Sequence, residues 1–132
     1  MKYKNEYLAA VRTINGMKAL PMRKESAPNI PEVPGVYVVT DHVNEEPVVI
    51  YVGRTTTGNL RARLTSYHLS GAPSSARIKK GLMETGVCAD NPEARKYLEE
   101  HCFVRFVQVP NEQIRRFMEH FLIAYFTPTL NR

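Results

Sequence analysis

The chain has few cysteines and no long apolar run, and each shortage excludes a class of protein. Two cysteines, Cys88 and Cys102, are too few for a disulfide framework, and a zinc site formed with His68 and His101 would lack the usual ligand spacing. No apolar run approaches the roughly 18 residues of a membrane helix, and the N-terminus has no signal-peptide pattern. The 132 residues suffice for one compact core. We expect a cytoplasmic protein without membrane contact.

Acidic residues are missing from the middle of the chain. Between Pro47 and Met83 the sequence contains no Asp or Glu. Six cations lie in this stretch: Arg54, Arg61, Arg63, Arg77, Lys79 and Lys80. Cations without acids are typical of a surface that faces phosphate groups, although a solvated basic patch has the same pattern. The net charge of +5 is moderate and does not by itself require a polyanionic partner.

The hydrophobic pattern predicts an α+β fold, a small three-stranded antiparallel sheet flanked by helices. The expected strands cover residues 33–41, 48–53 and 102–109, and the first two form a β-hairpin. The expected helices cover residues 4–14, 59–69, 74–85, 92–101 and 112–126. Asn59 and Asn111 are candidate N-caps. Residues 1–32 are expected to form an N-terminal helix and an extended, proline-containing lead-in, and residues 33–132 the main domain.

The hairpin carries the first candidate functional residues. Gly35-Val36-Tyr37 lies on one strand and Tyr51-Val52-Gly53 on its partner. Paired strands bring the two phenols close together, and the glycines leave room for a ligand to approach the backbone. Tyrosine is also a good strand former, so this pattern alone leaves a structural role open.

The helix after the hairpin carries Arg63, with Tyr67 one turn later on the same face. The permanent charge and five donors of arginine suit a phosphate whose negative charge rises during attack. Arg54 directly follows the second triplet and is placed to reach the same anion. His68 is a candidate phosphate contact or auxiliary acid. Ordinary solvent-facing positions on an amphipathic helix are the structural alternative for these residues.

The last expected helix carries Glu119. The apolar residues expected on its buried side are Ile114, Phe117, Phe121, Leu122 and Tyr125. The C-terminal half is apolar nearly all round, which places Glu119 away from the open solvent face. A carboxylate there needs a partner, because burying it alone is costly. A divalent cation would serve, and so would Arg115 one turn earlier.

Taken in order, these features resemble the GIY-YIG nuclease superfamily. The elements are PGVY, YVG, a helix with RL at its centre, a glutamate on a late helix and a final PTLN. The segment YVGRTTTGNLRARLTSY is similar to the incision nuclease domain of bacterial excision repair. The resemblance covers about residues 33–131. Two spacings are longer than is usual: 13 residues separate GVY from YVG, and Arg63 lies 12 positions after Tyr51. Both extra lengths fall in expected turns.

The resemblance implies a metal-dependent endonuclease that hydrolyses DNA phosphodiester bonds. Tyr37 or Tyr51 would activate the attacking water, Arg63 would stabilise the phosphate in the transition state, and Glu119 would hold one Mg²⁺ or Mn²⁺ ion. The candidate substrate-binding residues are Arg54, Tyr67, His68 and Asn131. Asn131 matches a late asparagine of the family with a structural or substrate-positioning role.

The expected partner is duplex or branched DNA, and a protein partner for targeting is compatible with the sequence. The sequence does not predict the oligomeric state. The alternative from another class is a non-catalytic nucleic-acid-binding protein that retains the nuclease fold. Such a protein would lack one of the residues needed for cleavage, and this chain contains all of them.

Overall fold

The computed structural model describes residues 2–68 and 77–131, with the side chain of Tyr67 outside the description. In this part of the chain, strands β1 (Leu20–Pro21), β2 (Gly35–Asp41), β3 (Val48–Arg54) and β4 (Cys102–Gln108) form one antiparallel sheet in the order β1-β4-β2-β3. The α+β class is confirmed, but the prediction of three strands is wrong. The additional strand β1 is two residues long, too short to produce an alternating pattern, and its proline is tolerated at a sheet edge.

Five α-helices, one 3-10 segment and one π-helical segment are described. The α-helices are α1 (Lys4–Gly16), α2 (Leu60–Ala62), α4 (Arg77–Glu84), α5 (Asn91–His101) and α6 (Glu112–Phe126). The 3-10 segment η1 covers Lys24–Asn29, and the π-helical segment η2 covers Arg63–Tyr67 and continues α2. The expected helices agree with these bounds, except that residues 69 and 74–76 lie outside the described part. None of the described helices has both the length and the apolar character to span a membrane.

Both predicted N-caps are confirmed. The side-chain oxygen of Asn59 accepts a hydrogen bond from the N–H of Ala62 at 2.9 Å. The side-chain oxygen of Asn111 accepts one from the N–H of Ile114 at 3.0 Å. Each cap satisfies a backbone donor that has no partner within its helix, and so fixes where the helix begins.

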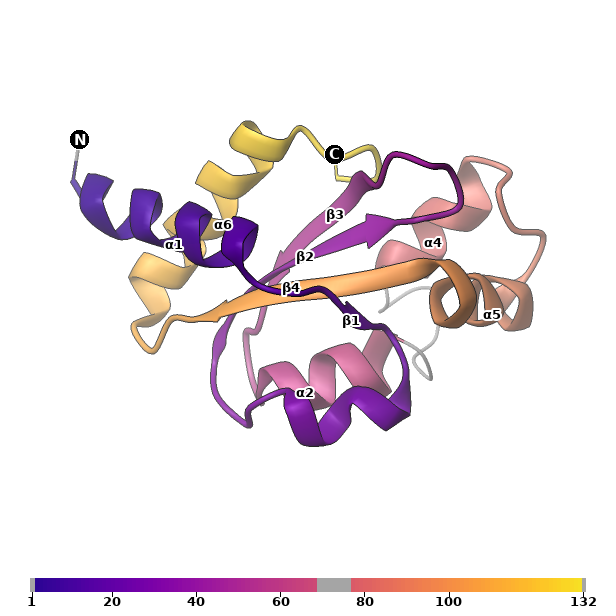
Figure 1. Ribbon diagram of the computed structural model, residues 1–132, viewed down its shortest axis with the longest axis horizontal. Coiled ribbons are helices and arrows are strands. Elements are labelled where there is room, and N and C mark those ends of the chain that lie inside the picture. Colours follow the sequence, from indigo (N-terminus) through magenta and orange to yellow (C-terminus); the bar gives the residue numbers. More distant parts are fainter. Residues whose placement is uncertain (1, 69–76, 132) are drawn as a thin grey trace.

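An apolar cluster lies on each face of the sheet, because successive strand residues point to opposite sides (Figure 1). Helices α1 and α6 cover the face that carries Val36, Val38 and Val52. Segments η1, α2, α4 and α5 cover the face that carries Tyr37 and Tyr51. We call these the valine face and the tyrosine face.

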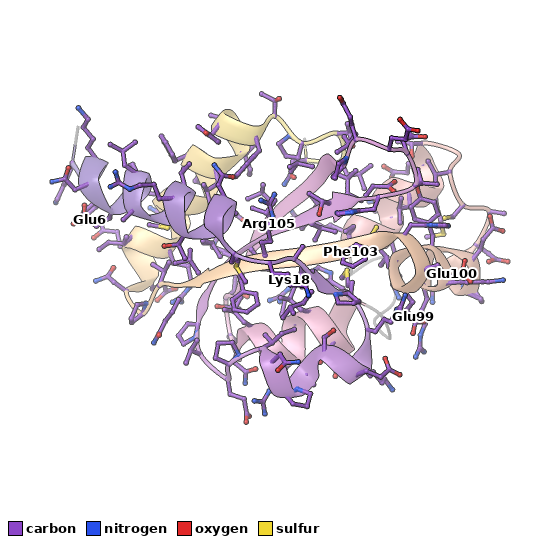
Figure 2. The ribbon with its side chains drawn as sticks, viewed as in Figure 1. Glu6, Lys18, Glu99, Glu100, Phe103 and Arg105 are labelled. Carbon is purple, nitrogen blue, oxygen red and sulfur yellow. The ribbon has the colours of Figure 1, made fainter. Side chains whose placement is uncertain are left out.

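The N-terminal segment is part of the same core. Ile14 at the end of α1 is fully buried in the cluster on the valine face. On β4, the Arg105 guanidinium donates to the carbonyl of Ile14 at 3.3 Å, tying α1 to the sheet (Figure 2). Residues 2–32 therefore contribute a strand to the sheet that carries the hairpin and a helix that packs on it.

The buried side of α6 agrees with the expected one at Leu122, and at Ile114 and Phe121, which pack against the cluster on the valine face, but it differs at two positions. The side chains that α6 buries are those of Arg115, Met118 and Leu122. Phe117 and Tyr125, which were expected to be buried, are 37% and 53% exposed. Because the C-terminal half of this helix is apolar nearly all round, its composition did not fix which side meets the sheet. Phe121 instead packs beside α1, where its ring stacks on Tyr7 with centroids 4.9 Å apart.

The hairpin register places both tyrosines on one face. Tyr37 pairs with Gly53 and Val39 pairs with Tyr51, after which the register shifts so that Ile50 is an extra, bulged residue on β3. The extended spacing between the two triplets is thus taken up by the loop at residues 42–47 and by this bulge. Without the bulge, a one-residue offset would turn a tyrosine to the opposite face.

Candidate active site

The ring of Tyr37 lies directly across Gly53. A Cβ added at Gly53 would lie 2.4 Å from the Tyr37 Oη and 2.5 Å from its Cζ, distances that real Cβ atoms do not show. Tyr37 is only 1% exposed, so its ring has no free space to move into. The glycine that ends the YVG triplet is therefore required by packing against the tyrosine of the first triplet.

Tyr37 is hydrogen-bonded to a buried histidine. Its Oη and the His68 Nε2 are 2.5 Å apart, and the Tyr51 ring lies beside both, 6.3 Å from the Tyr37 centroid and 5.9 Å from that of His68. Burial lowers the pKa of His68 to about 3, with smaller contributions from the positive charges of Arg63 and Lys79. The imidazole is therefore neutral near pH 7 and forms part of a compact polar group with two phenols.

A π-helical turn sets the position of His68. Its backbone N–H donates to the carbonyl of Arg63, five positions earlier, where an α-helix would bond four positions back. The wider turn brings residue 68 back over residue 63, whereas α-helical spacing would place it on another side. Tyr67 belongs to the same turn. The sequence pairing of Arg63 with Tyr67 assumed α-helical spacing, whereas the expected proximity of His68 to Arg63 agrees with this turn.

A cleft of about 510 Å³ opens beside the edge of β3. Tyr51 and Glu119 both line it. The other lining residues are Arg77, Lys80, Gly81 and Glu84 of α4, His120 and Ile123 of α6, and Leu130 and Asn131. Tyr37 and Arg63 are not among the described residues that line it. The two tyrosines thus differ: Tyr51 borders the cleft, and Tyr37 is enclosed beside it.

Glu119 has a partner that sequence reasoning did not foresee. The Arg54 Nη1 donates to the Glu119 Oε1, and the two side chains are 26% and 16% exposed. The alternative pairing with Arg115 is wrong. The Arg115 guanidinium faces the sheet, where it donates to the carbonyls of Thr55 at 2.8 Å and Val109 at 2.9 Å. Glu119 is largely covered, as the helical wheel predicted.

Three solved structures have a similar fold. They are crystal structures of the GIY-YIG N-terminal endonuclease domain of UvrC from Thermotoga maritima, one bound to its catalytic magnesium ion, and two point mutants with a tyrosine replaced by phenylalanine, each bound to the catalytic divalent cation. TM-scores are 0.50, 0.51 and 0.50, with 22% identity over 83% of this chain and 93–94% of the domain. The chain has the GIY-YIG fold. No family model and no curated protein sequence matches it.

The side chains at the cleft of this GIY-YIG fold suit a metal ion that keeps most of its water. Among residues 2–68 and 77–131, no three His, Cys, Asp or Glu side chains come together as a metal cage, and this includes the four residues of the zinc alternative. The carboxylates of Glu119 and Glu84 are hard oxygen ligands on the cleft wall. Mg²⁺ commonly binds through one or two carboxylates, completed by water and substrate phosphate, so this donor set fits Mg²⁺ or Mn²⁺.

Asn131 joins the end of the GIY-YIG fold to the sheet. Its Oδ1 accepts from the N–H of Val52 and its Nδ2 donates to the carbonyl of Val52, both at 2.8 Å. The N–H of Leu130 donates to the carbonyl of Ile50, also at 2.8 Å. Strand β3 lies at the edge of the sheet, where backbone N–H and C=O groups lack a neighbouring strand. These bonds give several of those groups a partner. Both ends of the Asn131 amide are thus bonded to the backbone of Val52.

The residues of α4 were missed as a group. Arg77, Lys80, Gly81 and Glu84 lie at spacings of three, four and seven along the helix, so they share one side that faces the cleft. Arg77 and Lys80 were named only as members of the basic stretch. The spacing itself was the available signal, since a polar stripe on a helix expected at residues 74–85 marks an exposed face. His120 was also missed; it lines the cleft next to Glu119 in sequence.

Proposed function

We propose that this protein is a divalent-metal-dependent endonuclease that hydrolyses DNA phosphodiester bonds. The observation that carries the proposal is the cleft that Tyr51, Glu119, Arg77 and Lys80 line together. A hydroxyl for proton handling, a carboxylate for a metal ion and cations for phosphate are the groups that such a reaction requires. The GIY-YIG fold, shared with an endonuclease domain, supports the same reaction class.

Glu119 is the residue that would hold Mg²⁺ or Mn²⁺. When bound, the ion supplies Lewis-acid polarisation of the phosphoryl oxygen and stabilises charge on the leaving oxygen. The Glu119 carboxylate is partly covered by protein, which strengthens its attraction for a cation relative to a fully solvated carboxylate.

Tyr51 is the tyrosine that we assign to the attacking water. It borders the cleft, and the phenol of Tyr37 is enclosed and bonded to His68. Tyr37 and His68 pack against the Tyr51 ring and restrict its rotation. A tyrosine held in one position at the cleft wall can, as the phenolate, accept the proton of the attacking water and, as the phenol, return a proton, which is the geometric requirement for general acid–base catalysis.

Three cations of the acid-free stretch, Arg63, Arg77 and Lys80, are assigned here to the phosphates. Arg77 and Lys80 line the same cleft as Glu119, where they would bind the DNA backbone. Arg63 is assigned to the negative charge that develops on the reacting phosphate, because its guanidinium is permanently charged and lies at the start of the turn that places His68 beside Tyr51. Its guanidinium donates to the Thr56 hydroxyl at 3.3 Å, which orients it.

Cleavage of labelled duplex, single-stranded and branched DNA with Mg²⁺ or Mn²⁺ tests the proposal. We expect metal-dependent cutting. Its rate should fall at least about a thousandfold in Glu119→Ala, because a coordinated metal ion lowers the activation barrier by several kcal/mol. DNA binding should persist, because the carboxylate that is removed repels phosphate. Glu112→Ala removes an equal charge from the exposed first turn of the same helix and is the matched control.

Two results would count against the proposal. Near wild-type cutting by Glu119→Ala would contradict the assigned metal site. Tight binding of every DNA without cutting under either metal would favour the alternative, a nucleic-acid-binding protein that retains the nuclease fold.

A further inference from the structure

The ion pair between Arg54 and Glu119 joins two residues with opposite assignments. Glu119 is the candidate metal ligand, and Arg54 is a candidate phosphate contact. Both side chains are partly buried, so their attraction is weakened less by water than that of an exposed pair. A divalent cation that approaches Glu119 therefore meets a carboxylate already neutralised by a guanidinium, with a positive charge beside it.

The surroundings of the pair add to this opposition. Arg77 and Lys80 line the cleft, and the other lining carboxylate, Glu84, is paired with Lys80 at 3.8 Å. The charges of these residues and the ion pair sum to an excess of one positive charge, with three cations against two carboxylates. Before an anion enters, the cleft thus disfavours a free divalent cation and attracts phosphate.

We propose that Arg54 couples metal binding to phosphate binding: a phosphodiester draws the Arg54 guanidinium away from Glu119, and the freed carboxylate then takes the metal ion. The inference rests on the proposed function, since it concerns the same metal site. Arginine suits the exchange because its planar fork matches phosphate as well as carboxylate. The Arg54 backbone stays fixed, paired with Val36 at the end of β3, and its partly exposed side chain can turn toward the cleft.

The exchange makes metal and nucleic acid cooperative ligands. Each raises the affinity of the other by the same factor, because coupling between two sites is reciprocal. The protein alone binds Mg²⁺ or Mn²⁺ weakly, and the complete site is assembled only on a phosphodiester. Metal recruitment is thereby confined to the substrate-bound protein.

Calorimetric titration of Mn²⁺ into the protein without nucleic acid provides the first arm of the test. We expect Arg54→Gln to bind Mn²⁺ at least about fivefold more tightly than wild type, the lower end of typical coupling factors. Arg54→Met, which keeps the apolar length of the side chain, should behave alike. Arg95→Gln is the matched control because it breaks another Arg–Glu pair, with Glu99 on α5, and should leave Mn²⁺ affinity unchanged.

Binding of a fluorescent DNA duplex in EDTA provides the second arm. Arg54→Gln should weaken DNA binding and reduce the salt slope by about one phosphate contact, so its effects on the two ligands have opposite signs. Loss of a merely structural ion pair would weaken both. The inference is overturned if the Arg54 variants fold, as judged by circular dichroism, and bind Mn²⁺ no more tightly than wild type. It is also overturned if both neutral variants misfold, because the ion pair is then required for folding.

Glu119→Gln separates failure of this inference from failure of the proposed function. Loss of Mn²⁺ binding in Glu119→Gln together with unchanged binding in Arg54→Gln refutes only the coupling. Undiminished Mn²⁺ binding in Glu119→Gln refutes the metal site itself, and with it the proposed function.

Discussion

The two faces of the sheet are built by the same two hairpin strands and have different chemistry. The valine face carries Val36, Val38 and Val52, and the tyrosine face carries Tyr37, Tyr51 and Gly53. The valine face packs against α1 and α6, and the tyrosine face holds two phenols and a buried imidazole beside an open cleft. Alternation along a strand therefore separates residues that stabilise the fold from residues assigned to chemistry, even where they are adjacent in sequence.

Helix α6 contributes residues both to the core on the valine face and to the cleft. Met118 and Leu122 pack on the valine face, and Glu119, adjacent to Met118 in sequence, lines the cleft beyond the edge of β3. The helix thus uses one side for stability and the next for the candidate metal ligand. Its placement on the sheet determines where that carboxylate lies.

The largest stability change is expected where the tyrosine face is most tightly packed. In Gly53→Ala the new methyl group would overlap the enclosed Tyr37 ring, so we expect a loss of about 3 kcal/mol in the free energy of unfolding. Gly16→Ala is the matched control, because a Cβ there meets no atom within 4 Å, and it should be neutral or slightly stabilising. Urea unfolding measures both, and wild-type stability in Gly53→Ala would refute the fixed position of Tyr37.

A smaller, pH-dependent change is expected from the buried imidazole. The pKa of His68 is lowered to about 3 in the folded protein and is near 6.5 when unfolded, so below pH 6.5 the unfolded state binds the proton first. Wild type should lose roughly 1.5 kcal/mol of stability between pH 6.5 and pH 5 that His68→Gln does not lose. Urea unfolding across this range tests the difference, and parallel pH dependences would mean that His68 is accessible to water.

Local sequence patterns predicted most of the fold. The alternating strands of the hairpin, the helical spacing that buries Leu60 and Leu64, and the caps Asn59 and Asn111 depend on neighbouring residues, and all agree with the structure. The order of the GVY and YVG triplets also indicated the GIY-YIG fold. Strand β1 escaped prediction because two residues pair with β4 only through tertiary contacts.

The parts of the candidate site that were missed depend on contacts between distant segments. The partner of Glu119 is Arg54, 65 positions away, and no local pattern distinguishes it from Arg115, one turn away. The bond between Tyr37 and His68 requires a π-helical turn, and a sequence pattern with α-helical period does not signal such a turn. The stripe on α4 was visible in the sequence, but only the fold shows that it faces Glu119.

The most direct test compares two neighbouring residues on opposite faces, Tyr51→Phe and Val52→Ala, by single-turnover DNA cleavage and by urea unfolding. We predict that Tyr51→Phe lowers the cleavage rate about a hundredfold, because it removes only the hydroxyl of a residue that lines the cleft. Val52→Ala should lose about 2 kcal/mol of stability from the buried core and, while folded, cleave near the wild-type rate. Wild-type cleavage by Tyr51→Phe, or a comparable rate loss in folded Val52→Ala, would contradict the division between a stabilising face and a face that carries the chemistry.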